Sequence, residues 1–116
     1  MGTVFIPQEP KRKDDGTGAM VPLYDLTPAL KFGTLKVLLP HGPVMLSTKP
    51  MVDHMRTEMD EFCDEDYILA VGDPAAIISA GMVASQANKG RVKLLWYDRQ
   101  QRAYIPLQFD LFNTVK

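Results

Sequence analysis

The fold is decided by residues 67–90, which read YILAVGDPAAIISAGMVASQANKG. They open with the apolar run Tyr67–Val71, of the kind that forms a strand buried on both faces. Gly72-Asp73-Pro74 follows, with a glycine for a tight turn, an aspartate suited to cap a helix, and a proline suited to its first position. The helix is predicted to continue to Gly90, which suits the left-handed backbone beyond a helix end. Because few of its residues are charged, we expect this helix to be buried on more than one side.

Two more strands are predicted on the C-terminal side of this helix. In residues 92–97 and again in residues 103–109, apolar side chains recur at every second position, which is the period of a strand. Only residues 98–102 separate the two runs, so they are predicted to form an antiparallel hairpin. Pro106 has no backbone N–H to donate, which places the second of these strands at the edge of a sheet.

A strand and a helix are predicted on the N-terminal side as well. Residues 34–39 (TLKVLL) form a short apolar run that ends at the loop of residues 40–43. From Thr48, which can cap a helix, apolar residues recur at steps of three and four while charged residues take the other faces. These apolar positions are Val52, Met55, Met59 and Phe62. One face of this helix is therefore predicted to pack on the sheet, and residues 64–66 are predicted to end it.

The order of these elements is strand, helix, strand, helix, strand, strand. We therefore predict an α/β fold with a small mixed sheet, in which two parallel crossovers lead to a C-terminal antiparallel hairpin. Residues 1–33 contain four prolines and a polar, glycine-bearing segment, so they are predicted to be an irregular N-terminal arm and linker. Residues 34–116 are predicted to be a single α/β domain. Within the arm, residues 4–6 are apolar enough to add a short strand to a sheet or to dock on a partner.

The composition is that of an ordinary globular chain. It has 116 residues, of which 46% are hydrophobic and 23% charged, and a formal net charge of -1, so overall charge does not attract it to nucleic acid or to an anionic membrane. Cys63 is the only cysteine and cannot form an internal disulfide, which indicates a reducing compartment. No window approaches the ~18 uninterrupted apolar residues of a membrane span. We expect a soluble, cytoplasmic protein with no membrane partner.

Ligands of open parallel sheets bind beyond the carboxyl ends of the strands, where the connecting loops converge. In the predicted topology that edge carries His41, Asp73, Asp98 and Arg99. His41 and Asp73 suit an acid/base pair, and Arg99 with the N-terminus of the second helix suits a phosphate. The interpretation of Asp73 as a helix cap is stronger, however, and neither common glycine-rich phosphate loop is present.

No pattern in the sequence identifies a catalytic residue, a metal site or a cofactor. His41, His54 and Cys63 lack the spacing of metal ligands, and the serines lack the strand-to-helix turn that exposes a nucleophile. The sequence leaves open whether the protein is an enzyme, and it favours a role in binding.

Charge is distributed unevenly along the chain. Residues 53–66 carry seven carboxylates against one arginine, and residues 89–102 carry five basic residues against one aspartate. Opposite charges of this kind complement each other between two copies or with a protein partner. The final hairpin also mixes aromatic and basic side chains, as platforms for single-stranded nucleic acid do. The candidate interaction residues are Trp96, Tyr97, Arg102, Tyr104, Ile105 and Leu107.

Residues 64–111 also carry a resemblance to a known group of proteins. They read DEDYILAVGDPAAI and then, after residues 78–88, KGRVKLLWYDRQQRAYIPLQFDL. The shared features are a D-x-D-Y strand opening, a G-[DN]-P helix start, and a G-R-V strand followed by an aromatic and Y-x-P hairpin. In these features the chain resembles small uncharacterised proteins encoded in tailed-phage and prophage genomes. The resemblance implies a phage or prophage context, and with it the host cytoplasm, but no activity and no functional residue.

Three functional hypotheses remain open. The leading one is a small accessory protein, phage-encoded, that acts through protein contacts or self-association at the hairpin edge and the arm. The second is a small-ligand or nucleotide-binding domain, enzymatic or not, that uses the carboxyl edge of the parallel strands. The third is binding of single-stranded nucleic acid by the C-terminal hairpin.

Overall fold

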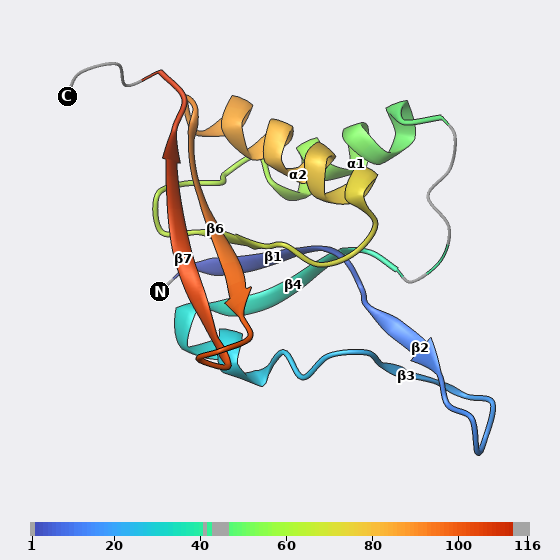
Figure 1. The fold of residues 1–116 in the computed structure, drawn as a ribbon. Helices are drawn as coiled ribbons and strands as arrows, with labels where there is room; N and C mark the ends of the chain where they lie inside the picture. The colour runs from blue at the N-terminus through green and yellow to red at the C-terminus, as the bar shows by residue number, and fades with distance from the viewer. Residues whose placement is uncertain (1, 41, 43–46, 113–116) are drawn as a thin grey trace.

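Five strands form the main sheet of this computed structural model, which describes residues 2–40, 42 and 47–112. Their order across the sheet is β4 (Thr34–Leu39), β1 (Thr3–Gln8), β5 (Tyr67–Leu69), β6 (Arg91–Asp98) and β7 (Ala103–Asp110). Neighbouring strands run parallel except β6 and β7, which form an antiparallel hairpin at one edge (Figure 1). The predicted mixed α/β sheet with parallel crossovers and a C-terminal hairpin is confirmed.

One interior strand of the sheet, β1, lies in a segment predicted to be irregular. β1 pairs with β4 on one side and β5 on the other, and its Val4 and Ile6 side chains are 0% and 1% exposed. The expectation that residues 1–33 form an irregular arm is therefore wrong for this strand, whereas the expectation that residues 4–6 could add a short strand to a sheet is confirmed. Pro7 is the misleading residue, because proline is rarely found in a central strand. Here the pairing of β1 with β5 stops at Phe5, so Pro7 removes no hydrogen bond from that ladder.

The chain leaves β1 and returns to β4 on the side of the sheet away from the α-helices. β2 (Lys11–Lys13) and β3 (Met20–Pro22) pair in a separate two-stranded ribbon that projects from the body of the protein (Figure 1). A 3₁₀-helix, η1 (Thr27–Phe32), then leads into β4, and its Ala29 is fully buried against the sheet.

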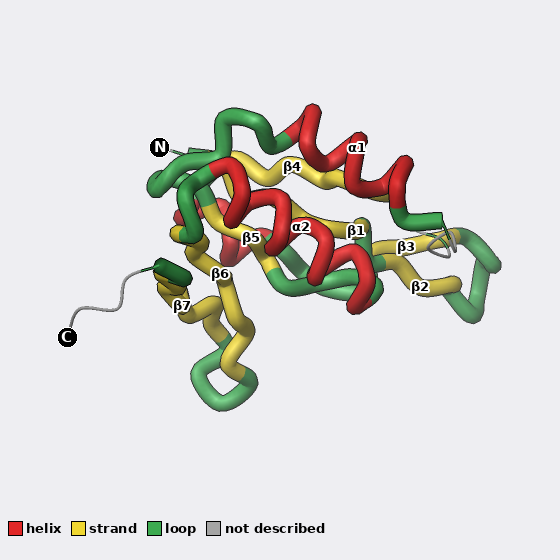
Figure 2. The backbone as a smooth tube through the Cα atoms, turned by 90° about the horizontal axis from the view of Figure 1, so that it is seen from above, coloured by secondary structure: helices red, strands yellow, loops and turns green. Residues whose placement is uncertain are grey.

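Both α-helices pack on the other face of the sheet. α1 (Lys49–Glu58) and α2 (Pro74–Ala87) lie side by side there (Figure 2). The core beneath them is formed by Phe5, Leu38, Met51, Met55, Met59, Phe62, Ile68, Ala76, Ala80, Val83 and Ala84. A smaller cluster fills the η1 side: Val4, Ile6, Ala29, Leu69, Leu95 and Tyr104.

The helix boundaries follow the predicted signals in part. Asp73 caps α2 as predicted, because its Oδ1 accepts a hydrogen bond from the Ala75 N–H at 2.8 Å. Thr48 stands at the N-cap of α1 but makes no capping bond with its side chain. α1 also ends earlier than predicted, at Glu58, although Met59 and Phe62 beyond it remain buried in the core.

Two helices are too narrow to cover five strands. Strands lie roughly 4.8 Å apart and a helix with its side chains is about 10 Å wide, so each helix covers about two strands. Viewed from above, α1 lies near β4 and α2 lies over the middle of the sheet (Figure 2). Within the part of the chain that the structure describes, no α-helix lies over β7.

Candidate functional site

The uncovered part of the sheet over β6 and β7, with the adjoining side of α2, is an apolar surface that we call the open face. Leu94 packs against the core beneath the helices, and Trp96, two residues further along β6, points to the same side. Leu107 and Ile105 of β7 pair with these two residues and share their face. The exposed members of the open face are Ile78, Met82, Trp96, Leu107, Phe109, Leu111 and Phe112, with exposed fractions from 38% for Leu107 to 70% for Phe112.

A groove runs along α2 on the side that faces the hairpin. One hollow of about 370 Å³ lies between Gly81 of α2 and Phe109 of β7. A second hollow of about 640 Å³ extends over Ile78 and Met82 toward Phe112. Both linings are mainly apolar, so the groove has the character of the buried centre of a protein interface.

α2 carries no Asp, Glu, Lys or Arg along its 14 residues. The prediction that it is buried on more than one side fails on its outer side, because Ile78 and Met82 are 63% and 60% exposed. Gly81 lies between them in the sequence, and a Cβ built there meets no atom within 4 Å. A glycine inside a helix costs about 1 kcal/mol relative to alanine. No contact among the described residues requires glycine at this position.

The free edge of β7 is a poor template for adding another strand. The Leu95 carbonyl accepts from the Ala70 N–H at 3.3 Å, so the backbone of Leu95 hydrogen-bonds toward β5 rather than toward Pro106, its partner on β7. The nitrogen of Pro106 therefore faces the outer edge. Because proline has no backbone N–H, an incoming strand would find no hydrogen-bond donor at this position. The predicted interaction residues Ile105 and Leu107 are thus better placed to make contacts with their side chains than through the backbone edge.

The carboxyl edge of the parallel strands is closed by Gln8, a residue that no motif in the sequence marks. Its side chain is buried, accepts from the Asp73 N–H at 2.8 Å and donates to the Gly42 carbonyl at 2.6 Å. Gly72 packs so tightly here that a Cβ on it would lie 2.6 Å from the Cβ of Gln8. The strand order reverses between β1 and β5, which is where ligands of such sheets bind. In this protein its own glutamine side chain occupies that crevice.

The four residues predicted to bind a ligand at this edge have different surroundings. Asp98 and Arg99 line a common groove. Asp73 does not line that groove, and its carboxylate is engaged by the Ala75 N–H in the helix cap. His41 lies outside the described residues.

The groove at Asp98 and Arg99 has a volume of about 740 Å³ and lies at the carboxyl ends of β5 and β6. We call it the aromatic groove, because its lining includes Tyr24, Trp96, Tyr97 and Tyr104. Burial raises the pKa of Tyr104, and the neighbouring Tyr97 adds to the shift. This shift stabilises the fold below the unfolded pKa of about 10, and the stabilisation is lost as pH rises through the folded pKa.

The other predicted interaction residues divide between these two surfaces. Trp96 belongs to both the open face and the aromatic groove. Tyr97 and Tyr104 make an edge contact in the aromatic groove, with their ring centroids 5.2 Å apart. Arg102 lies in the hairpin turn with a φ of 52° and lines neither groove.

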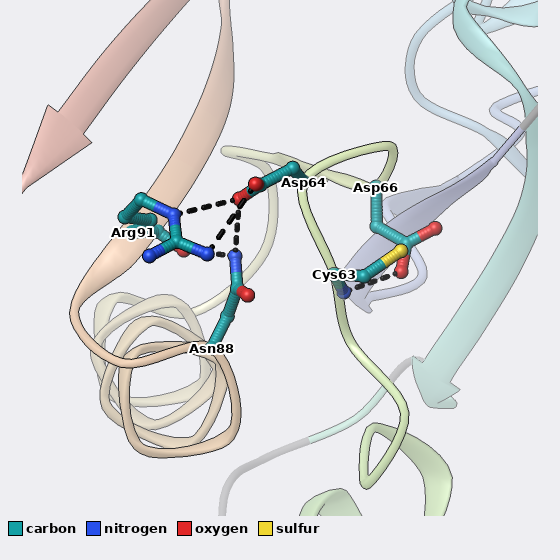
Figure 3. Close-up of polar contacts among 5 residues, drawn as sticks. All are labelled: Cys63, Asp64, Asp66, Asn88 and Arg91. Atoms are coloured by element: carbon teal, nitrogen blue, oxygen red, sulfur yellow. Dashed lines mark hydrogen bonds and ion pairs between the residues drawn. The ribbon is translucent and has the colours of Figure 1, made fainter.

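The acidic loop after α1 ties distant parts of the chain together. The Asp64 carboxylate accepts from Asn88 Nδ2 at 2.8 Å and from Arg91 Nε at 3.0 Å, which joins this loop to the turn between α2 and β6 (Figure 3). Asp66 beside it accepts from the Cys63 N–H at 2.9 Å. Some of the opposite charges noted in the sequence therefore pair inside the chain.

The hydrogen bond from Arg91, followed by that from Asn88, lowers the pKa of Asp64 below its ordinary value. A lowered carboxyl pKa stabilises the fold above the unfolded value of about 4, and the contribution is lost as pH falls through the folded pKa. The pair is exposed, so this contribution is small.

Neither a metal-binding cluster nor a membrane-spanning helix is found among the described residues. There, no group of three or more His, Cys, Asp and Glu side chains is placed to hold a metal ion. No helix in that part of the chain is long and apolar enough to cross a membrane.

Comparison with known proteins gives one match. The model of a family described as Phage Pam3 gp32-like protein matches residues 2–111. The chain belongs to the Phage Pam3 gp32-like protein family. The predicted resemblance to phage-encoded proteins is thereby confirmed, and the match extends beyond residues 64–111 to include β1. No curated protein and no solved structure matches the chain. The residues matched by the Phage Pam3 gp32-like family include all of the open face except Phe112.

Proposed function

We propose that this Phage Pam3 gp32-like protein is an accessory protein that acts through protein–protein contacts made by its open face. The observation that carries the proposal is the exposure of Met82, Trp96 and Phe109 by 60%, 50% and 51% within the open face. Single exposed apolar side chains are common, but contiguous patches of several hundred Å² usually mark an interaction site.

The composition of the open face supports the same function. Trp96, Phe109 and Phe112 offer large rigid rings, which bury much area for little loss of conformational entropy. The grooves beside α2 give a partner's side chains places to insert. The aromatic rings and grooves together resemble the centre of an interface, where a few anchors in apolar pockets supply most of the binding energy.

A photo-crosslinking residue at Met82 tests this proposal in cells infected by the phage that encodes the protein. We expect covalent adducts with one defined protein, either a second copy or another chain, identified by mass spectrometry. The reason is that Met82 would lie inside the contact and within reach of partner atoms.

The matched control carries the same photo-crosslinking residue at Leu30. Leu30 is a 50% exposed residue of η1, on the opposite side of the sheet from α2. It should give no adduct with that protein. The absence of adducts at Met82, or the same adducts at both positions, would reject the open face as an interaction site.

A second candidate function, binding of a planar anionic ligand, is favoured by the aromatic groove. Four aromatic residues and Arg99 line a volume of about 740 Å³, which is within the size range of small-ligand pockets. Exposed rings suit stacking on a base, and a guanidinium suits a phosphate. The same features would serve a single-stranded nucleic acid, whose binding would weaken steeply with added salt.

Titration with AMP tests the second candidate, because Trp96 is the only tryptophan of the chain and lines the groove. We expect saturable quenching of its fluorescence, weakened about tenfold by Arg99→Ala through loss of a charge-assisted hydrogen bond. Lys13→Ala, in the projecting ribbon, serves as the control for loss of one positive charge. Unchanged fluorescence at millimolar AMP would remove mononucleotides as ligands, and a parallel titration with a thymidine decamer addresses nucleic acid.

A further inference from the structure

We propose that the partner of the open face is a second copy of the same chain. In this dimer, α2 of each copy lies in the groove beside α2 of the other and covers the exposed β6–β7 hairpin. The inference rests on the proposed function and adds the identity of the occupant.

The shape of the open face matches the helix that lies beside it. Packed helices lie about 8–10 Å apart, which is close to the width of two strands. A helix placed next to α2 would therefore cover the strands that α2 leaves open. A two-fold axis parallel to α2 puts both α2 helices in one layer between the two sheets, and each helix then covers the hairpin of the other copy. Such an isologous contact is the commonest arrangement of soluble homo-oligomers.

α2 has the properties of a helix that is covered on both sides. It is uncharged along its whole length, although its Ile78 and Met82 are exposed in the single chain. Gly81 faces the groove, and the space where its Cβ would lie is empty. A second helix could approach the backbone closely at this point, which explains a glycine that the single chain does not need.

The apolar area is sufficient for a stable dimer. The exposed surface of the seven exposed members of the open face adds up to that of about four fully exposed side chains. At roughly 200 Å² for each large apolar side chain, the open face offers about 800 Å². This is what one partner contributes to an interface of standard size.

The alternative way for two copies to join, edge to edge through β7, is disfavoured by Pro106. Its nitrogen faces the free edge and offers no donor to an incoming strand. Residues 4–6, predicted as a segment able to pair with a neighbour, are already occupied inside the sheet of their own chain. Contact between the two open faces is therefore the favoured way for two copies to join.

Charges at one end of the groove are complementary in this arrangement. Lys89 follows α2, and Asp110 ends β7 beside Gly90, so both lie at the same end of the groove. When α2 of one copy lies over the hairpin of the other, Lys89 of each copy comes close to Asp110 of its partner. Both opposite-charge contacts then lie at that end of the groove, one on each side of the two-fold axis, and they fix the register of the two copies.

The mass of the purified full-length chain, measured by sedimentation equilibrium over a range of concentrations, tests the dimer. We expect twice the chain mass of 13.0 kDa. Met82→Asp should weaken association at least about 100-fold, because it places an unpaired charge in an apolar contact. Leu30→Asp, on the opposite side of the sheet, should change it by less than about twofold, and circular dichroism should show both variants folded.

A charge exchange tests the orientation of the two copies. Lys89→Glu and Asp110→Lys should each weaken the dimer about tenfold, because each brings like charges together twice. An equimolar mixture of these two variants should form heterodimers with wild-type affinity, since both contacts then join opposite charges. Rescue by mixing requires contact between copies, so pairing of Lys89 with Asp110 inside one chain cannot produce it.

The outcomes separate this inference from the proposed function. A monomer at all concentrations whose Met82 still forms adducts with another protein in infected cells overturns the dimer and leaves the proposed function standing. A monomer without such adducts overturns both. A dimer that is insensitive to Met82→Asp, or a mixture of charge variants that stays dissociated, overturns the arrangement proposed for the two copies.

Discussion

Replacing Gly72 with alanine is expected to lower the free energy of unfolding by about 4 kcal/mol, the combined cost of a strained backbone and an overpacked site. Gly72 has a φ of +114°, which side chains with a Cβ rarely adopt, and the new Cβ would lie 2.6 Å from the Cβ of Gln8. Neither residue can move away easily, because Gln8 belongs to an interior strand and is hydrogen-bonded to the loops on both sides. The midpoint of urea unfolding should therefore fall, with an unchanged m-value.

Gly16→Ala is the matched control for this variant. Gly16 lies in the turn between β2 and β3, where the nearest atom to an added Cβ is an Asp14 carboxylate oxygen 3.6 Å away. Its replacement should change the free energy of unfolding by less than about 0.5 kcal/mol. If Gly72→Ala were equally harmless, Gln8 would not close the crevice between β1 and β5 in solution.

Truncating Ile6 to alanine is expected to cost about 3.5 kcal/mol of stability, as large-to-small replacements in a core do. Ile6 is 1% exposed and lies on the interior strand β1 among Val4, Leu69 and Leu95. The lost transfer free energy is increased by the cavity that remains, because these neighbours come from three different strands and cannot close over it together. Urea unfolding monitored by circular dichroism measures the effect.

Val37→Ala is the control, because Val37 is the β4 residue in register with Ile6 but is 43% exposed. Its truncation should cost less than about 1 kcal/mol, since it removes little buried surface. Equal, small effects at both positions would mean that the N-terminal segment does not contribute a core strand in solution.

From Thr34 onward, the elements could be predicted because their signals are local. The strand at residues 34–39 is observed with the predicted bounds, and Asp73 and Pro74 mark the start of α2. The hairpin follows from the alternation of residues 92–97 and 103–109 and from the short link between them. Each of these signals is a property of neighbouring residues and needs no knowledge of the rest of the fold.

β1 could not be predicted in the same way, because its signal is a pairing between distant residues. Ile6 pairs with Val37 and Phe5 with Ile68, and no short stretch of sequence records these partners. Its six residues include Pro7, which is a local argument against a central strand. The topology that places β1 between two other strands overrides this local preference.

The candidate site was predictable in part for the same reason. Trp96, Ile105 and Leu107 were selected from the pattern of the hairpin. Ile78, Met82 and Phe109 were not, because an uncharged helix is usually buried and the sequence does not show which strands α2 covers. One feature of the sequence does indicate such a surface. The second predicted helix is uncharged, and the two predicted helices are too few to cover the whole width of the sheet.

The sequence by itself determined the α/β class, the cap that starts α2, the C-terminal hairpin and the resemblance to phage proteins, because each depends on residues close together in the chain. The tertiary structure decided that β1 is an interior strand, that Gln8 fills the crevice where ligands of such sheets bind, and that neither α-helix covers β7. These features depend on which distant segments meet. The pairing that forms them is stabilised by burial of surface across the whole sheet rather than by any local preference.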